Sequence, residues 1–250
     1  MIKAIVFDFD GTLFHFVLDY EGMRNATEKV VTDAGVSVSL FVGGERIRDI
    51  VSKMLEYAKT HGWPDNKKKE VMDEIYSVMD HYEWESARNN SPVDGAKEVL
   101  RSLKEIGLKT GLLTNNSKRS ILYLLKKYKF GKLLDVIVTR NDLGDFNNLK
   151  PSPVGLNQVL EKFGVRASEA VYVGDSVVDV RAAISVGTTP IFVATGYSTR
   201  KEIEENYPRV TIISELKKLL AYLEETGKIP AAGNTRQASG NQVKTSSLRN

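Results

Sequence analysis

The chain has 250 residues, of which 42% are hydrophobic and 27% are charged, a balance typical of a globular protein rather than a disordered one. It contains no cysteine, which excludes a disulfide framework, a thiolate metal site and a cysteine nucleophile. The net charge of +3 is matched by three basic residues among the last twenty, where no acidic residue occurs. The rest of the chain is therefore neutral and gives no indication of a nucleic-acid partner.

The hydrophobic segments are short. No apolar run reaches the length of a transmembrane helix, so we expect no membrane partner. An acidic pair, Asp8 and Asp10, lies within the first ten residues, which is untypical of a secretory signal peptide. Together with the absence of cysteine, these features predict a cytoplasmic protein.

The first predicted element is a buried strand at 2–7, where apolar and β-branched residues run up to Asp8. From about residue 20 to residue 86 the apolar residues recur at helical spacing, in stripes at 23–34, 47–58 and 71–82. No convincing strand pattern interrupts them. We interpret residues 16–89 as an inserted α-helical subdomain.

After Pro92 the pattern becomes an alternation of helices and strands. The predicted helices cover about 96–106, 121–128, 153–163, 177–186 and 216–223, and the predicted strands cover 108–113, 136–138, 170–173 and 190–194. This alternation predicts an α/β fold with a Rossmann-like parallel sheet, helices on both faces and right-handed crossovers, built from residues 1–15 and 90–228. The segment 229–250 has little to bury, and we expect it to be disordered.

Polar residues follow the expected strands at their carboxyl ends, where open α/β sheets have their active sites. These residues are Asp8 and Asp10 after the first strand, Thr114 and Asn115 after the second, Lys150 after the third, and Asp175 and Asp179 after the fourth. If the sheet is parallel, they converge on one edge. The sequence therefore predicts a single site made from distant segments.

The chemistry of these side chains indicates phosphoryl transfer. Several carboxylates in one crevice repel each other, and a hard divalent cation such as Mg²⁺ removes that repulsion. A lysine and a threonine hydroxyl beside the cation suit the oxygens of a phosphoryl group. One carboxylate can then attack phosphorus, and a second can protonate the leaving group and activate water.

Four motifs resemble those of the haloacid dehalogenase superfamily, in the family's order. They are Asp8-Phe9-Asp10-Gly11-Thr12, Thr114, Lys150-Pro151, and the segment 174–179 with Asp175 and Asp179. The resemblance covers roughly residues 1–225 and is nearest to the phosphoglycolate phosphatase and β-phosphoglucomutase branch. It implies that the helical insertion is a type 1 cap, which closes over the substrate and excludes water.

The resemblance also implies a role for each matching position. Asp8 matches the nucleophile and a metal ligand, and Asp10 matches the general acid/base, with its backbone carbonyl as a further ligand. Asp175 and Asp179 match the remaining acidic residues around Mg²⁺. Phosphate-binding groups are expected at Gly11, Thr114, Asn115 and Lys150, and Arg46 in the insertion is a candidate for gripping the substrate.

One departure from the family concerns the residues after the first motif. Many relatives have an Asp-Ser pair near position 15, whereas this chain has His15-Phe16. The catalytic groups are unaffected, but the nearby substrate contacts must differ. Asp10 itself favours phosphate-ester chemistry, since the dehalogenase members of the superfamily do not keep an aspartate there.

Simpler structural interpretations exist for several of these residues. Thr114 could be a helix N-cap, Lys150 a surface lysine, and Asp175 a first-turn acid stabilised by the helix dipole. For Arg46, a solvated helical face is the favoured interpretation.

Three functions remain open from the sequence. The first is hydrolysis of a small-molecule phosphate monoester, in which inorganic phosphate is released. The second is a sugar-phosphate phosphomutase, in which the phosphoryl group is retained. The third is a regulatory protein that binds phosphate or metal without turnover, and the intact Asp8 and Asp10 argue against it.

Overall fold

The computed structural model describes residues 1–230. The segment 231–250, most of the predicted disordered tail, lies outside the described residues. Ile229, which the sequence analysis placed in that tail, is 4% exposed, and its N–H donates to the carbonyl of Leu223 at 3.2 Å. No helix within 1–230 is both long and apolar enough to span a bilayer.

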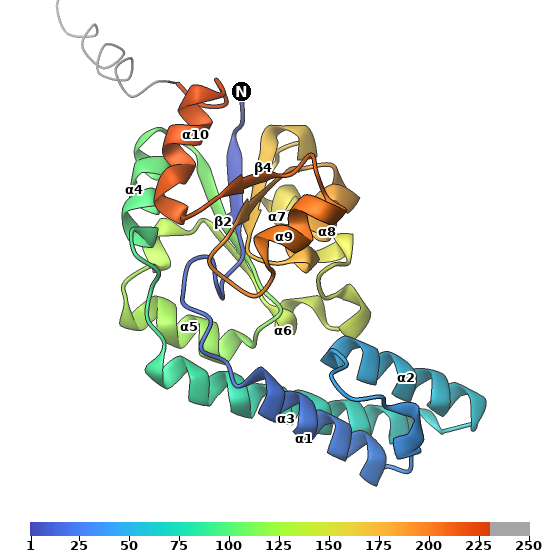
Figure 1. Cartoon of the computed structure of the whole chain (residues 1–250). Helices are drawn as coiled ribbons and strands as arrows, with labels where there is room; N and C mark the ends of the chain where they lie inside the picture. The colour runs from blue at the N-terminus through green and yellow to red at the C-terminus, as the bar shows by residue number, and fades with distance from the viewer. Residues whose placement is uncertain (231–250) are drawn as a thin grey trace, which may run out of the picture. The chain divides into compact units, whose positions relative to one another are not determined.

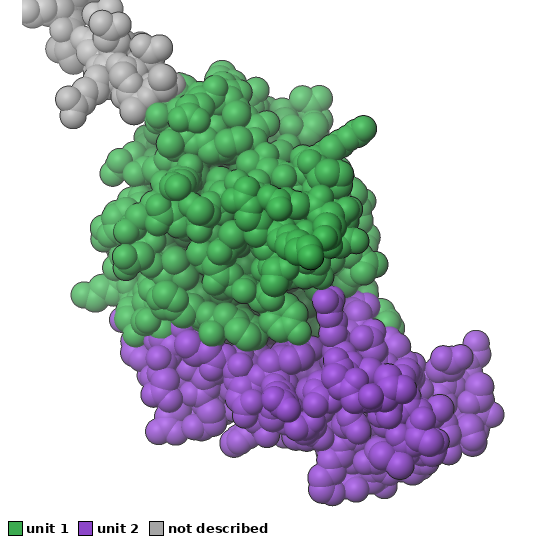
Figure 2. All heavy atoms as spheres, viewed as in Figure 1, with its two compact units in different colours: residues 1–16, 91–115, 128–250 green, residues 17–90, 116–127 purple. Residues whose placement is uncertain are grey.

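The chain divides into two compact units, drawn in different colours in Figure 2. Unit 1 contains residues 1–16 and 91–115, and from 128 onward the rest of the described chain. Unit 2 contains residues 17–90 and 116–127.

Unit 1 is built on a six-stranded parallel sheet with the order β3-β2-β1-β4-β5-β6. The strands are β1 (Ala4–Phe7), β2 (Lys109–Leu113), β3 (Val136–Val138), β4 (Ala170–Gly174), β5 (Thr189–Val193) and β6 (Thr211–Ile213). All four residues of β1 are fully buried, because this strand lies between β2 and β4 at the centre of the sheet. The predicted α/β fold with a parallel sheet is confirmed.

Helices cover both faces of this sheet. The helices of unit 1 are α4 (Ala96–Glu105), α6 (Arg140–Leu143), α7 (Pro153–Phe163), α8 (Val177–Val186), α9 (Arg200–Asn206) and α10 (Leu219–Glu225). Figure 1 shows α4 and α10 on one side of the strands and α7 and α8 on the other. Helix α4 packs on β2 and α10, while α7 and α8 pack together and cover β2–β3 and β4–β5.

Unit 2 is helical. It contains α1 (Tyr20–Asp33), α2 (Ile47–Thr60), α3 (Asp65–Asn89) and α5 (Lys118–Lys127), with α1 packed on α2 and α3. The stripe predicted at 47–58 is the buried face of α2, where Ile50, Val51, Met54 and Ala58 are fully buried. The predicted stripe at 71–82 is the middle of a longer helix, α3.

The grouping of α5 differs from the expected division of the chain, which assigned its residues to the α/β core. Three contacts join α5 and the turn before it to α3. Trp84 meets the ring of Tyr123 edge-on at 5.1 Å and lies 4.0 Å from the guanidinium of Arg119. The buried carboxylate of Glu83 accepts a 2.7 Å hydrogen bond from the N–H of Ser117, just before α5 begins.

Candidate active site

The sheet has a topological switch point at its centre. The chain runs from β1 to β2 in one direction along the sheet, and β4 to β6 extend in the other, so β1 and β4 are neighbours with a crevice at their carboxyl ends. Asp8 is the first residue after β1, and Asp175 is the first after β4. The backbone N–H of Asp8 donates to the carbonyl of Val173 at 2.9 Å, which aligns the two strand ends.

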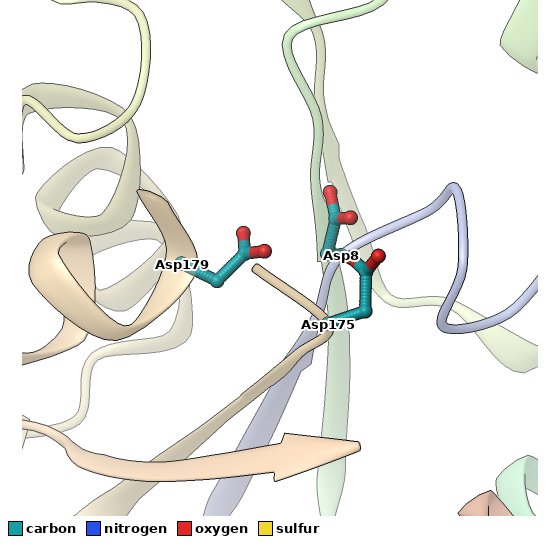
Figure 3. Close-up of side chains that lie close together, drawn as sticks. All are labelled: Asp8, Asp175 and Asp179. Atoms are coloured by element: carbon teal, nitrogen blue, oxygen red, sulfur yellow. The ribbon is translucent and has the colours of Figure 1, made fainter. Parts of the chain in front are cut away.

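Three carboxylates meet at this switch point. Asp8, Asp175 and Asp179 each offer an oxygen within 4.8 Å of the others, and the residues are 7%, 2% and 1% exposed. Figure 3 shows Asp8 and Asp175 side by side, with the carboxyl group of Asp179 directed toward them. Asp179 reaches this position because α8 begins there, with Ser176 as N-cap and Asp179 three residues later in a capping box.

Lys150 supplies the positive charge of the cluster. Its buried ammonium group donates to Oδ1 of Asp8 and, at 2.7 Å, to Oδ1 of Asp179. The backbone at Lys150 is fixed by Asn115, whose side chain accepts from the N–H of Lys150 at 2.9 Å and donates to its carbonyl at 3.2 Å. The buried guanidinium of Arg140 in turn donates to the Asn115 carbonyl at 2.7 Å. These hydrogen bonds of Asn115 thus position Lys150.

Asp179 has hydrogen-bond donors on both of its oxygens. Oδ1 accepts from Lys150 and from the hydroxyl of Tyr172, at 3.1 Å, while Oδ2 accepts from the N–H and hydroxyl of Ser176. Tyr172 lies in β4 and is 1% exposed. The carboxylate is therefore held in one orientation, with its charge directed at Lys150.

Asp175 is enclosed by backbone from two loops. Its Oδ2 accepts a 2.7 Å hydrogen bond from the N–H of Tyr197. A Cβ added to Gly11 would lie 2.3 Å from this oxygen, and one added to Gly196 would lie 1.6 Å from it. Only glycine can occupy these two positions with the carboxylate in place. The loop at 194–199 was not predicted from the sequence, although the Thr195-Gly196 pair shortly after β5 was a signal for it.

The electrostatics of the cluster raise the pKa of two carboxyl groups. Burial, followed by the charge of Asp179, raises the pKa of Asp8 to about 6 even though Lys150 acts in the opposite direction. Burial and the charges of Asp8 and Asp179 raise the pKa of Asp175 to about 9. For Lys150, burial alone would lower the pKa, but the charges of Asp179 and Asp8 outweigh it and hold the pKa well above its ordinary value.

The donor set fits a divalent cation. Three carboxylates and one ammonium group leave an excess of negative charge in a buried place, and oxygen ligands are those that hard divalent cations prefer. Such a cation would favour the ionised forms of Asp8 and Asp175 and so lower both raised pKa values.

Comparison with known proteins identifies the family. The family model described as haloacid dehalogenase-like hydrolase matches residues 2–187. The chain belongs to this family. It is 30% identical to a phosphoglycolate phosphatase of Pseudomonas savastanoi over 227 residues, which cover 87% of this chain and 78% of the relative. It is 28% identical to a phosphoglycolate phosphatase of Aliivibrio fischeri, with 89% and 96% covered.

A solved structure supports the same fold. The crystal structure of a hydrolase from Pseudomonas syringae matches with a TM-score of 0.62 at 23% identity, covering 89% of this chain and 98% of that one. The family model and the phosphoglycolate phosphatase relatives confirm the resemblance identified from the sequence motifs, and the chain is a phosphatase-type member of the haloacid dehalogenase-like hydrolases.

Of the remaining predicted site residues, three follow strand ends and one belongs to unit 2. Asp10 is partly exposed in the turn after β1 and forms a backbone bridge with Phe14. Gly11 has a left-handed backbone, with φ of 74°, and its carbonyl accepts from the hydroxyl of Thr195 at 2.7 Å. Thr114 directly follows β2 and is 2% exposed. Arg46 belongs to the other unit, where it is the N-cap residue of α2.

Proposed function

We propose that the chain is a Mg²⁺-dependent phosphatase that hydrolyses a small-molecule phosphate monoester through an aspartyl phosphate on Asp8. The observation that carries the proposal is the buried contact of Asp8 with Lys150, beside two further carboxylates at the switch point of the sheet. A carboxylate in this environment can act as a nucleophile because Lys150 balances the charge of the group it attacks.

The reaction has two steps. In the first, an oxygen of Asp8 attacks phosphorus while Asp10 gives a proton to the departing alkoxide, and an acyl phosphate forms on Asp8. In the second, Asp10 takes a proton from water as the water attacks the same phosphorus, which restores the Asp8 carboxylate and releases inorganic phosphate. Lys150 and the hydroxyl of Thr114 bind the phosphoryl oxygens during both steps.

Asp8, Asp175 and the backbone carbonyl of Asp10 would hold Mg²⁺, with Asp179 acting directly or through water. The cation would supply charge neutralisation and orientation of the phosphoryl group when bound. Gly196 and the N–H of Tyr197 fix the carboxylate of Asp175 for this role. Asp179 and Asn115 hold Lys150 at its side chain and its backbone.

The sequence predicts that residues 16–89 form a cap. We assign substrate choice and water exclusion to this helical segment. Arg46 is its candidate contact to the substrate. The phosphoglycolate phosphatases among the relatives make phosphoglycolate the first ester to test. The cytoplasmic location expected from the sequence stays a prediction.

Release of inorganic phosphate from a panel of monoesters with Mg²⁺ tests the proposal. Asp8→Asn should reduce turnover by about a thousandfold or more while the protein stays folded. Asp10→Asn should lose most activity on alkyl phosphates. Asp94→Asn is the matched control, since Asp94 is exposed in the same unit and forms an ion pair with Lys217 at 3.3 Å.

Turnover retained by Asp8→Asn would refute the covalent mechanism. A phosphoryl group retained on a rearranged sugar phosphate, without release of phosphate, would identify a phosphomutase instead. No turnover of any ester by the wild type would favour the regulatory alternative.

A further inference from the structure

An aromatic pair lies beside the candidate active site in unit 1. The rings of Phe16 and Tyr197 meet edge to face, with centroids 5.7 Å apart and planes at 62°. The side chain of Tyr197 is 46% exposed, and Phe16 is partly exposed. The pair is therefore not part of the hydrophobic core, where aromatic rings such as Phe7, Phe9 and Phe14 are almost fully buried.

Both rings are attached to the backbone that surrounds the reacting groups. The N–H of Tyr197 donates to the Asp175 carboxylate at 2.7 Å, and Thr195, two residues earlier, donates to the carbonyl of Gly11. Phe16 follows Phe14, whose carbonyl accepts from the N–H of Gly11 at 2.7 Å. Two loops that are distant in sequence thus converge on Gly11, and each carries one ring of the pair.

The pair has a definite binding chemistry. Two rings at this angle present an edge and a face, and a third flat ring can stack on one while meeting the other edge-on. Stacking on aromatic side chains is tolerant of ring identity and needs no charge. A small alkyl or carboxylate group would gain little from such a surface, so the pair favours a flat leaving group.

On the basis of the proposed phosphatase function, we propose that Phe16 and Tyr197 bind the leaving group of the substrate, and that this group carries a flat aromatic or heteroaromatic ring. The substrate class is then a phosphate monoester of a ring-bearing alcohol, of which a nucleoside monophosphate is one example. Phe16, one of the two positions at which this chain departs from many relatives, belongs to this surface.

Two pairs of esters isolate the ring from the chemistry. Adenosine 5′-monophosphate and ribose 5-phosphate release phosphate from the same 5′ position and differ in the base. Benzyl phosphate and cyclohexylmethyl phosphate have similar alcohols and similar size, but only the first has a flat ring. For each pair the ratio of kcat/KM values reports the contribution of the ring.

The wild type should favour the ring-bearing ester of at least one pair by about fivefold or more, and Tyr197→Ala should bring that ratio close to one. Tyr197→Phe, which keeps the ring, should retain the preference. Phe16→Leu should weaken it. All three variants keep the backbone N–H of residue 197, which donates a hydrogen bond to the Asp175 carboxylate. The control variant Tyr123→Ala removes an aromatic ring from α5 and should leave the ratio of kcat/KM values unchanged.

The proposal is overturned if neither pair shows a preference, or if Tyr197→Ala lowers kcat/KM equally for both members of a pair. Equal lowering would assign Tyr197 a purely structural role. The proposed phosphatase function is tested separately. It is refuted only if no ester of the panel releases phosphate, and it does not depend on the ratio of kcat/KM values.

Discussion

The tightest contact in the site gives the sharpest prediction, and it concerns Gly196. Gly196 has no Cβ. An added Cβ would lie 1.6 Å from Oδ2 and 2.3 Å from Cγ of Asp175. Contacts of a Cβ below 3.0 Å essentially do not occur, so the Gly196→Ala substitution must separate the loop at residue 196 and the carboxylate oxygen by about 1.4 Å or more. The chain around Gly196 is a loop, and the expected damage is local.

The displacement has a calculable consequence for the cation. It breaks the 2.7 Å hydrogen bond from the N–H of Tyr197, and a hydrogen bond to a charged group contributes about 1.5–3 kcal/mol. Loss of the partner that orients a metal ligand typically lowers metal affinity by about 10- to 100-fold. We therefore expect the Mg²⁺ concentration for half-maximal activity to rise by about that factor, with a smaller loss of activity at saturating Mg²⁺.

The assay is a Mg²⁺ titration of phosphate release by the wild type, Gly196→Ala and a control. Gly131→Ala is the matched control, because a Cβ there meets nothing within 4 Å and Gly131 does not have a positive φ. Unchanged Mg²⁺ dependence in a folded Gly196→Ala variant would refute the assignment of Asp175 as a positioned metal ligand.

Two further predictions concern the same cluster. Tyr172→Phe removes the 3.1 Å hydrogen bond to Asp179 that helps to orient Lys150, and should lower kcat about three- to tenfold, whereas Tyr222→Phe, which loses a 2.8 Å bond to Thr211, should destabilise the fold without changing kcat. Equal kcat for the two variants would contradict the positioning role. The second prediction concerns pH. The pKa values of Asp8 and Asp175, about 6 and about 9, lie above the ordinary 3.8, so the folded protein retains protons that the unfolded chain has released. In chelator its stability should therefore fall as pH rises from about 4 through 6 and toward 9, and the Tm gained on adding Mg²⁺ should be larger at pH 9 than at pH 6. A Tm gain independent of pH would contradict it.

The elements that the sequence predicted well are those with a long or unambiguous hydrophobic pattern. The strand predicted at 136–138 and the helices at 153–163 and 177–186 have the same bounds in the structure. The edge strand β6 was missed, although it is as long as β3, which was predicted. Helix α9 was also missed, since its only buried residue is Ile203 and a single apolar position gives no stripe.

The site was predictable to the extent that it depends on strand ends. Asp8 and Asp175 could be brought together from the sequence because parallel strands place their carboxyl ends on one edge. The contribution of Gly196 could not, since it consists of a missing side chain and a close approach that only the folded chain reveals. Tyr172 gave only a weak signal of a role in the site, because it places a hydroxyl within a buried strand. The hydroxyl donates to Asp179, which lies on the following helix.

The most direct test of the account is a crystal structure of the protein with Mg²⁺ and beryllium fluoride, which mimics a phosphoryl group on a carboxylate. We predict beryllium bonded to an oxygen of Asp8, with fluorides next to Lys150 and Thr114 and Mg²⁺ in contact with Asp8 and Asp175. Beryllium fluoride bound away from Asp8, or Mg²⁺ that does not touch Asp8, would contradict the account.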